Sequence, residues 1–365
     1  MRTGATAQEV ARLAKVSQSA VSRTFTPGAS VSDATRERVV AAAKTLGYRP
    51  NALARSLITR RSHIVALVMG YLQNQFYPQV IQQLSQLLQR EGYHVLLFIS
   101  DESETDGALA EILQYQVDAI VIASAMLSQN LAQQCVDSGV PVVLFNRLPD
   151  VDSARQDTIS VTSDNRAGGR LVADLLVARG HQRIAFMAGL ENSSTSVERE
   201  RGFVEGLHAA GQSVWRRAVG HYSFERAQAA TLELFQGNER PDALFAANDH
   251  MAIAAMDVLR HNLGLRVPQD VSVVGFDDVP QAAWAGYQLT TVVQDVPAMV
   301  AATVTLLKER MDDTESARSI VIDCRLVERG SVRAAPCATP RSARPPRRSA
   351  TRAPSTTTTM RDTTP

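Results

Sequence analysis

Four polar side chains near the N-terminus have the types and spacing needed to read a DNA duplex. Residues 17–23 read SQSAVSR. In a helix, the apolar residues of this stretch face a core and leave Gln18, Ser19, Ser22 and Arg23 on the outer face. Glutamine can pair bidentately with adenine and arginine with guanine, so Gln18 and Arg23 can hydrogen-bond base edges. The stretch therefore predicts a face that recognises bases.

A second set of polar side chains follows predicted strands and could hold a small molecule. Asn248 ends the run ALFAAN and Asp277 ends VSVVGFD, while Arg199 supplies a guanidinium group. Amides, carboxylates and guanidinium groups make the fixed hydrogen bonds that a hydroxyl-rich ligand needs, and Phe76 or Tyr77 could cover a sugar face. These residues are the predicted ligand contacts.

Each residue of the second set also has a purely structural interpretation. Asn248 and Asp249 could form an N-cap pair, because a helical pattern follows them. Asp277 and Asp278 could form a turn. Arg199 could make a surface ion pair with the glutamates beside it. The sequence leaves these alternatives open.

Three short amphipathic helices are expected to position the base-reading face. Thr6, Ser17 and Ser32 are suitable N-caps, and Gly47 lies just past the end of the third helix. A short turn between the first two helices predicts a helix-turn-helix, whose second helix enters the major groove. A generic helical bundle is the alternative. Apolar residues at core spacing are Val10, Ala11, Leu13 and Ala14 in the first helix and Val39, Val40, Ala43 and Leu46 in the third.

From residue 64 the apolar residues form short runs. IVALVMG, YHVLLFIS, AIVIAS and PVVLFN lie between residues 64 and 146; TISVTS, RIAFMAG, a stretch near 218, ALFAAN and VSVVGFD follow between 158 and 277. Helical stretches separate many of them, which is typical of buried parallel strands with helices on both faces. Two successive groups of such units predict two doubly wound lobes with a ligand cleft between their strand ends.

Three ordered blocks at the N-terminus carry a family resemblance. They read A-x-x-A-x-V-S-x-x-x-V-S-R, V-S-x-x-T-R-x-R-V and L-G-Y-x-P-N-x-x-A-R-x-L. Their order and spacing resemble the DNA-binding end of the LacI/GalR family of bacterial transcription regulators. The resemblance implies DNA contacts from Thr6, Ser17, Gln18, Ser19, Ser22, Arg23, Thr35, Arg36, Asn51, Ala54 and Leu57.

The rest of the chain, to about residue 331, resembles the effector domain of that family, which is built like the periplasmic sugar-binding proteins. The matching motifs are Asn74-Gln75-Phe76-Tyr77, Ser163-Asp164-Asn165, Arg199-x-x-Gly202-Phe203, Ala247-Asn248-Asp249, Gly275-Phe276-Asp277-Asp278 and Gln294-Asp295. The resemblance implies effector contacts from Phe76, Tyr77, Asp164, Arg199, Asn248, Asp277 and Gln294.

The segment after Pro50 is expected to connect the two functions. Residues 51–57 make only about two turns of helix, too short to be stable alone in water. In the family this hinge helix enters the minor groove and a leucine wedges open the central base step; the matching residue here is Leu57. The alternative is that Leu53 and Leu57 pack on the helical head.

Charge divides the chain into a basic head, an acidic body and a basic tail. Residues 1–63 carry a net charge of +8, residues 333–365 carry +6, and the middle carries −13, although the whole chain is only +1. A basic end on an acidic body is the electrostatic pattern of a protein that binds phosphate at one end. The Pro-, Arg-, Ser- and Thr-rich tail is expected to be disordered, either as a solvated extension or as an aid to nonspecific DNA affinity.

Several function classes lack their usual sequence anchors. Cys135, Cys324 and Cys337 have no metal-ligand spacing, and an odd, sparse set fits a reduced cytosolic compartment. No GxGxxG follows a strand, and neither GxxxxGK[ST] nor GxSxG occurs, so no cofactor, no metal and no enzymatic activity is expected. The chain also has no apolar signal segment or membrane-length run.

These observations predict an α/β protein with an N-terminal all-α helix-turn-helix head and a periplasmic-binding-protein-like body of two doubly wound lobes. The expected domains are 1–49 (DNA-binding head), 50–63 (hinge helix and linker), 64–331 (effector-binding and dimerisation body) and 332–365 (tail). The expected function is a homodimeric repressor that binds a pseudo-palindromic operator under control of a carbohydrate-like effector. The alternatives are corepressor-dependent or activating control, a periplasmic solute-binding protein, and an α/β enzyme.

Overall fold

The fold was analysed in a computed structural model, which describes residues 5–26, 28–49, 61–70, 72–99, 111–123, 137–148, 159–312 and 318–335. The predicted hinge residues Asn51, Ala54 and Leu57, and the tail from residue 336 onward, lie outside the described residues. None of the described helices is long and apolar enough to cross a membrane.

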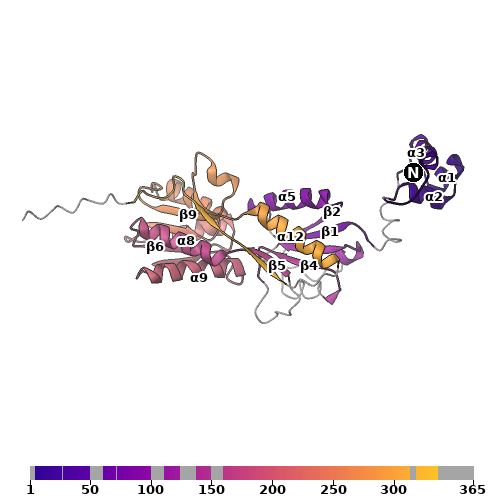
Figure 1. The fold of residues 1–365 in the computed structure, drawn as a ribbon. Coiled ribbons are helices and arrows are strands. Elements are labelled where there is room, and N and C mark those ends of the chain that lie inside the picture. The colour runs from indigo at the N-terminus through magenta and orange to yellow at the C-terminus, as the bar shows by residue number, and fades with distance from the viewer. Residues whose placement is uncertain are drawn as a thin grey trace, which may run out of the picture.

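The N-terminal head consists of α1 (Ala7–Ala14), α2 (Gln18–Thr24) and α3 (Asp33–Leu46) (Figure 1, indigo). Thr6 and Glu9 form a reciprocal capping box on α1, and the Ser17 hydroxyl accepts from the N–H of Ala20 to cap α2. Gly47 ends α3 in the left-handed conformation. The three predicted helices and their boundaries are therefore confirmed.

The core of the head is narrower than the apolar pattern predicts. Val10, Val21 and Val39 are fully buried together with alanines from α1 and α3. Three of the expected core residues are instead exposed. A bundle of three short helices encloses little volume, so side chains at the edge of each apolar stripe remain in water. These residues are Leu13 (50% exposed), Val40 (49%) and Leu46 (37%).

Two six-stranded sheets form the body, in the orders β11-β5-β4-β3-β1-β2 and β12-β10-β9-β8-β6-β7. All pairings are parallel except that between β10 and β12. The strands of the first sheet are β1 (Ile64–Met69), β2 (His94–Ile99), β3 (Ala119–Ala123), β4 (Val142–Phe145), β5 (Ile159–Ser163) and β11 (Ser319–Ile322). Those of the second are β6 (Ile184–Ala188), β7 (Arg216–Val219), β8 (Ala243–Ala246), β9 (Ser272–Asp277), β10 (Thr290–Val293) and β12 (Arg325–Val327).

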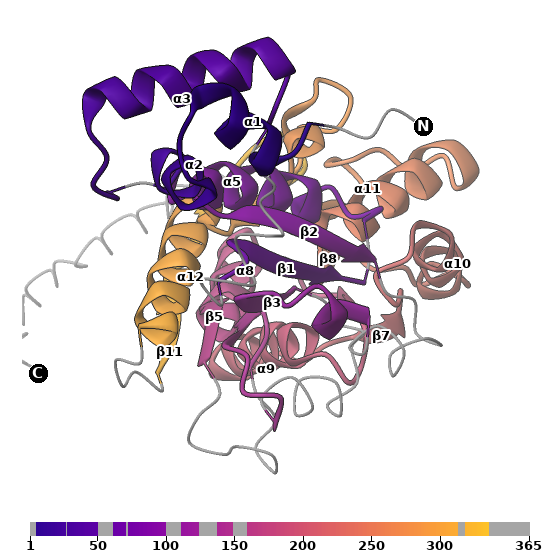
Figure 2. The same cartoon turned by 90° about the vertical axis from the view of Figure 1, so that its right-hand side faces the viewer.

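Helices cover the sheets of both lobes. In the first lobe α5 (Phe76–Arg90) and α12 (Val296–Met311) lie side by side and bury alternate residues of β1, such as Leu67, on one face of the sheet (Figures 1 and 2). The second lobe contains α8 (Asn165–Ala178), α9 (Ser194–Ala209), α10 (Phe224–Leu234) and α11 (Asp249–Asp257).

The two lobes are not successive along the chain, which corrects the grouping predicted from sequence. The run TISVTS was grouped with the second lobe, but it forms β5, which pairs with β4 in the first sheet. The chain then returns to the first lobe for α12 and β11. It therefore crosses between the lobes at residues 163–165, 294–295 and 323–324. The strands after residue 277 were missed because they are short and begin with polar residues, as TTVV, SIVI and RLV, so none forms a continuous apolar run.

Contacts of the second lobe continue past residue 331. The guanidinium of Arg333 donates to the carbonyl of Gly180 (2.8 Å), and its N–H donates to the hydroxyl of Ser272 (3.0 Å). The contacts of the second lobe therefore include residue 333.

Two glycines bring the backbones of α8 and α9 into contact. A Cβ atom on Gly202 would lie 1.9 Å from the carbonyl oxygen of Arg166, and one on Gly169 would lie 2.1 Å from that of Arg199. Only hydrogen fits at such distances, so glycine is required at both positions. This close approach sets Arg199 of α9 beside the start of α8.

We expect Gly202→Ala to lower the free energy of unfolding of the body by about 1–3 kcal/mol or more, because a buried methyl group would force the two helices apart. Gly286→Ala is the matched control, since a Cβ there meets nothing within 4 Å and the backbone φ is not positive. Denaturant melts of both variants measure the difference; equal stability would contradict the close packing of α8 and α9.

Candidate functional site

The predicted base-reading side chains lie on one open face of α2. Gln18, Ser19, Ser22 and Arg23 are all exposed. The Nε of Arg23 donates to the carbonyl of Ser19 on its own helix (3.4 Å). The Ser19 hydroxyl lies 2.9 Å from that of Ser17. Helix α2 thus presents donors and acceptors outward, as recognition of base edges requires.

Four of the other predicted DNA contacts lie in the described part of the head, where they also make structural hydrogen bonds. Thr6 and Ser17 are exposed N-caps, so their hydroxyls also stabilise helix ends. The hydroxyl of Ser32 donates to that of Thr35 (2.9 Å). Ser32 occupies the N-cap position of α3, but its side chain makes no hydrogen bond to the helix backbone. Arg36 donates to the carbonyl of Thr24 at the end of α2 (3.1 Å). Arg36 therefore links α3 to α2.

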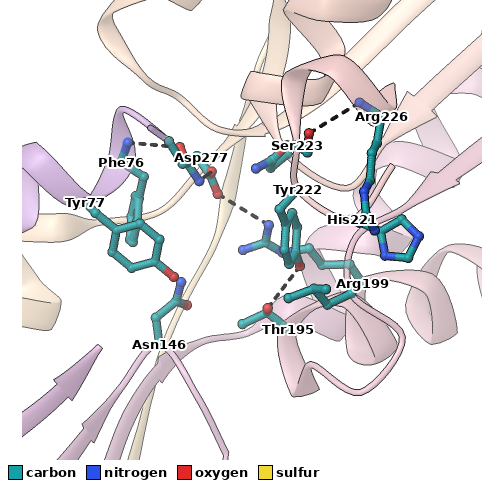
Figure 3. A pocket seen from close by; sticks show the side chains of 13 residues that line it. Phe76, Tyr77, Asn146, Thr195, Arg199, His221, Tyr222, Ser223, Arg226 and Asp277 are labelled. Carbon is teal, nitrogen blue, oxygen red and sulfur yellow. Dashed lines mark hydrogen bonds and ion pairs between the residues drawn. The ribbon is translucent and has the colours of Figure 1, made fainter. Parts of the chain in front are cut away.

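A cavity of about 250 Å³ lies between the two lobes of the body (Figure 3). Side chains reach it from both lobes, at the carboxyl ends of several strands. This is where a ligand binds in open parallel sheets. Its walls are formed by Asn74, Phe76, Tyr77, Asn146, Leu190, Thr195, Arg199, His221, Tyr222, Ser223, Arg226, Asn248 and Asp277.

Five of the seven effector residues expected from sequence line this cavity: Phe76, Tyr77, Arg199, Asn248 and Asp277. The other two are not part of its walls. Asp164 caps α8 by accepting from the N–H of Ala167 (2.9 Å). Gln294 lies behind Asp277 and donates to its carboxylate (2.7 Å).

An ion pair between Arg199 and Asp277 forms one wall of the cavity. Nη1 of Arg199 lies 3.3 Å from Oδ1 of Asp277, and each side chain is only 2% exposed. The guanidinium also donates to Oδ1 of Asn165 (2.8 Å) and to the carbonyl of Ala247 (2.6 Å) and lies over the ring of Phe276. The alternative of a surface pair with neighbouring glutamates is therefore wrong.

Asp277 is held in an unusual environment. Burial raises the pKa of its carboxyl, while Arg199 and the amides of Asn74 and Gln294 act in the opposite direction. Its backbone φ is +123°, and that of Asp278 is +56°, values that L-residues adopt only under strain. A strained turn that places a buried carboxylate in a cavity is typical of a functional site.

Asn248 combines the structural and functional interpretations of its position. Its Oδ1 caps α11 by accepting from the N–H of Met251 (2.9 Å). Its Nδ2 has no hydrogen-bond partner among the described residues, although the side chain is 1% exposed. On the first lobe, Oδ1 of Asn146 also lacks a partner within the described part of the chain. The cavity therefore offers one free donor and one free acceptor to a ligand.

Asp249, the second member of the expected N-cap pair, makes structural hydrogen bonds outside the cavity. It is fully buried outside the cavity walls and accepts from the Thr291 hydroxyl (2.6 Å) and the N–H of Val279 (2.9 Å). Burial raises its pKa to about 7, and the nearby charge of Asp277 acts in the same direction. Asp249 thus joins α11 to the segments around β9 and β10.

Aromatic rings come from both lobes. Figure 3 shows Tyr77 of the first lobe and Tyr222 of the second on opposite sides, with Asn146, Arg199 and Asp277 around them. The hydroxyl of Tyr222 lies 3.1 Å from that of Thr195. Burial raises the pKa of Tyr77, which is therefore a neutral phenol. Two such rings can cover the faces of a flat or pyranose ligand.

Sequence reasoning missed several residues of the cavity walls. Asn74 belongs to a motif noted in the sequence but was not assigned a role. His221 and Tyr222 follow the short strand β7 and both have positive φ values, which no sequence pattern indicated. The missed wall residues are Asn74, Asn146, Leu190, Thr195, His221, Tyr222, Ser223 and Arg226.

Within the described residues, no group of three or more His, Cys, Asp or Glu side chains is arranged to hold a metal ion.

Comparison with known families matches both parts of the chain. Residues 6–51 match the model of bacterial regulatory proteins of the lacI family, and residues 173–332 match the periplasmic binding protein-like domain. The HTH-type transcriptional regulator CelR of Thermobifida fusca is 35% identical over 336 residues, covering 89% of this chain and 98% of that protein. Catabolite control protein A of Priestia megaterium is 30% identical over 321 residues, covering 87% of this chain and 95% of that protein.

Solved structures show the same architecture. The lac repressor dimer bound to operator and the anti-inducer ONPF matches with a TM-score of 0.82 at 27% identity, covering 91% of this chain and all of that one. A CelR–cellobiose complex matches with a TM-score of 0.68 at 33% identity, covering 90% of this chain and 99% of that one. With similarity across both the head and the body, the protein belongs to the lacI family of bacterial regulatory proteins and is a transcription regulator.

Proposed function

We propose that this protein is a repressor that binds a pseudo-palindromic operator as a homodimer, and that a carbohydrate in the interlobe cavity controls this binding. The observation that carries the effector assignment is the buried amide of Asn248, whose Nδ2 donor has no partner among the described residues and lines the cavity. A buried polar group without a partner costs free energy that a ligand hydroxyl can recover. The open face of α2 supports the DNA-binding part of the proposal.

The chemistry of the cavity supports a carbohydrate as effector. A hydroxyl can accept from Asn248 and donate to Asn146, and the Tyr77 and Tyr222 rings can lie against the apolar faces of a pyranose. The solved CelR structure contains cellobiose, so cellobiose is the first ligand to test. Because a bacterial operator lies in the cytosol, this function requires a cytosolic protein.

We propose further that the cavity binds and does not catalyse. Among the described contacts, the Asp277 carboxylate already accepts from Asn74 and Gln294 and is paired with Arg199. A carboxylate engaged in this way suits recognition better than proton transfer. Incubation of cellobiose and other β-glucosides with the pure protein, followed by chromatography, should return them unchanged.

The experiment that tests the function as a whole is selection of duplexes from a random library, followed by titration of the recovered DNA with and without sugars. We expect a palindromic sequence to be selected, because two copies of α2 would read symmetric half-sites. The ligand should change the affinity of the protein for this DNA only by as much as the ligand prefers one orientation of the lobes over the other. Recovery of unrelated sequences would contradict the proposal.

We expect Arg23→Ala to cost roughly 1–3 kcal/mol on the selected operator and to relax sequence preference at one symmetric pair of positions. Lys44→Ala is the control, since Lys44 carries the same charge in the last turn of α3. Fluorescence anisotropy on operator and scrambled duplexes separates the two effects. An equal loss on every sequence would make Arg23 a phosphate contact.

We expect Leu57→Ala to reduce both operator bending and specific affinity, because the proposed wedge unstacks a minor-groove step and permits the bend. The melting temperature of the body should remain unchanged, since the residue lies in the predicted hinge segment. A gel-phasing assay measures the bend; an unaltered bend would remove the wedge from the proposal.

We expect Asn248→Ser to weaken ligand binding by about tenfold or more, because serine keeps an N-cap oxygen for α11 but removes the amide donor that faces the cavity. Asp164→Ser is the matched control, since it makes a similar cap exchange at α8 outside the cavity walls. In thermal-shift titrations, a ligand at 100 times its Kd stabilises the wild type by about 2.7 kcal/mol. If both variants bind equally well, the cavity assignment is wrong.

A further inference from the structure

Three crossing segments connect the lobes, and a buried serine in the first contacts the second. Ser163 is the last residue of β5 and begins the crossing at 163–165. Its hydroxyl donates to Oε1 of Gln294 in the second crossing segment (2.8 Å). The N–H of Asp164, in the same crossing as Ser163, donates to the carbonyl of Ile322, the last residue of β11 before the third crossing (2.8 Å).

Hydrogen bonds join these crossing segments to the ion pair of the cavity in a closed ring. Gln294 donates from Nε2 to Oδ1 of Asp277 (2.7 Å), and Asp277 pairs with Arg199 (3.3 Å). Arg199 donates to Oδ1 of Asn165 (2.8 Å), and Asn165 donates back to the carbonyl of Ser163 (2.9 Å). All five side chains are buried. Only Arg199 and Asp277 line the cavity.

We propose that Gln294 is a positioning residue that relays the state of the Asp277 carboxylate to the crossing segments through Ser163, and that it is not a ligand contact. The inference rests on the proposed function in taking the cavity as the effector site. It replaces the sequence-based expectation that Gln294 touches the effector.

The relay has a direct physical basis in the amide group. When Nε2 of Gln294 donates to a carboxylate, the amide becomes polarised and its Oε1 becomes a better acceptor for the Ser163 hydroxyl. A ligand hydroxyl that donates to Asp277 competes for the same negative charge. The Ser163–Gln294 bond then weakens, and with it the connection between the first and second crossings.

The sharing of Asp277 makes this competition unavoidable. A carboxylate has about four lone-pair positions. Gln294 and Arg199 approach Oδ1, and Asn74 of the first lobe donates to Oδ2 (3.3 Å). A ligand that uses two hydroxyls on this carboxylate must therefore weaken or displace one of these three bonds, of which the Asn74 bond spans the lobes and the Gln294 bond reaches a crossing segment.

Hydrogen–deuterium exchange of the ligand-free full chain tests the relay directly. Peptides covering residues 159–168 report the N–H of Asp164, which is bonded from the first crossing to the last residue of β11. We expect Asp277→Asn to increase exchange there at least about threefold, because the neutral side chain polarises Gln294 less. In the Ser163→Ala background the same substitution should have no further effect there beyond the increase that loss of the ion pair causes in all peptides of the body, since the relay is already interrupted.

Ser160→Ala is the matched control for this double-mutant cycle. Ser160 lies on the same strand and donates to the hydroxyl of Ser319 on β11 (2.7 Å), outside the ring. Asp277→Asn should increase exchange by the same factor in this background as in the wild type. Gln294→Met provides a second interruption of the ring and should also abolish the response, whereas Ser163→Thr should retain it. Additive effects of Asp277→Asn and Ser163→Ala would overturn the relay.

A second experiment, in which ligand is added, distinguishes failure of this inference from failure of the proposed function. With cellobiose as probe and the selected operator as DNA, Ser163→Ala should keep the sugar affinity within about threefold of wild type while the effect of sugar on operator affinity falls severalfold. An unchanged sugar effect in Ser163→Ala would overturn the relay. If the wild type ignores cellobiose, the ligand assignment fails, and the exchange cycle still decides the relay.

Discussion

The buried ion pair between Arg199 and Asp277 is the interaction on which the rest of the body depends. Two charges removed from water are tolerated only if their remaining hydrogen-bonding positions are filled. Here Asn165, the carbonyl of Ala247 and the ring of Phe276 surround the guanidinium, and Asn74 and Gln294 serve the carboxylate. Loss of either charged partner would leave an uncompensated charge in the interior, at a cost of about 3–5 kcal/mol.

The close contact of α8 and α9 follows from this requirement. Arg199 reaches Asn165 only because glycines at 169 and 202 let the two helix backbones touch. The ion pair then holds the strained end of β9 so that Asp277 lines the cavity. Helix packing, backbone strain and the ion pair therefore all fix the cavity wall that the second lobe provides. The opposite wall comes from the first lobe. A ligand between the walls acts on the relative position of the lobes.

The crossing segments explain how a small ligand can influence a distant DNA-binding head. The chain passes between the lobes three times, so neither lobe can turn without changing the geometry around Ser163 and Gln294. These two side chains are hydrogen-bonded to each other, and Gln294 donates to Asp277 in the cavity wall. Allosteric control requires such an element, because a ligand shifts an equilibrium only through contacts that differ between its states.

The sequence by itself determined the features that depend on near neighbours. Caps such as Thr6 and Ser17 bond residues three positions away, and apolar runs mark β1 to β9 wherever they pair, so the head and these nine strands were predictable. Residues at or just after strand ends, such as Asp277 and Asn248, were predictable as cavity walls because parallel strands end at a common edge. Only the tertiary structure decided the partners of each strand and each side chain. Asn74 and Asp277 are 203 positions apart, and Gln294 lies behind Asp277 instead of lining the cavity. Packing between the lobes selects these contacts, and no local pattern encodes them.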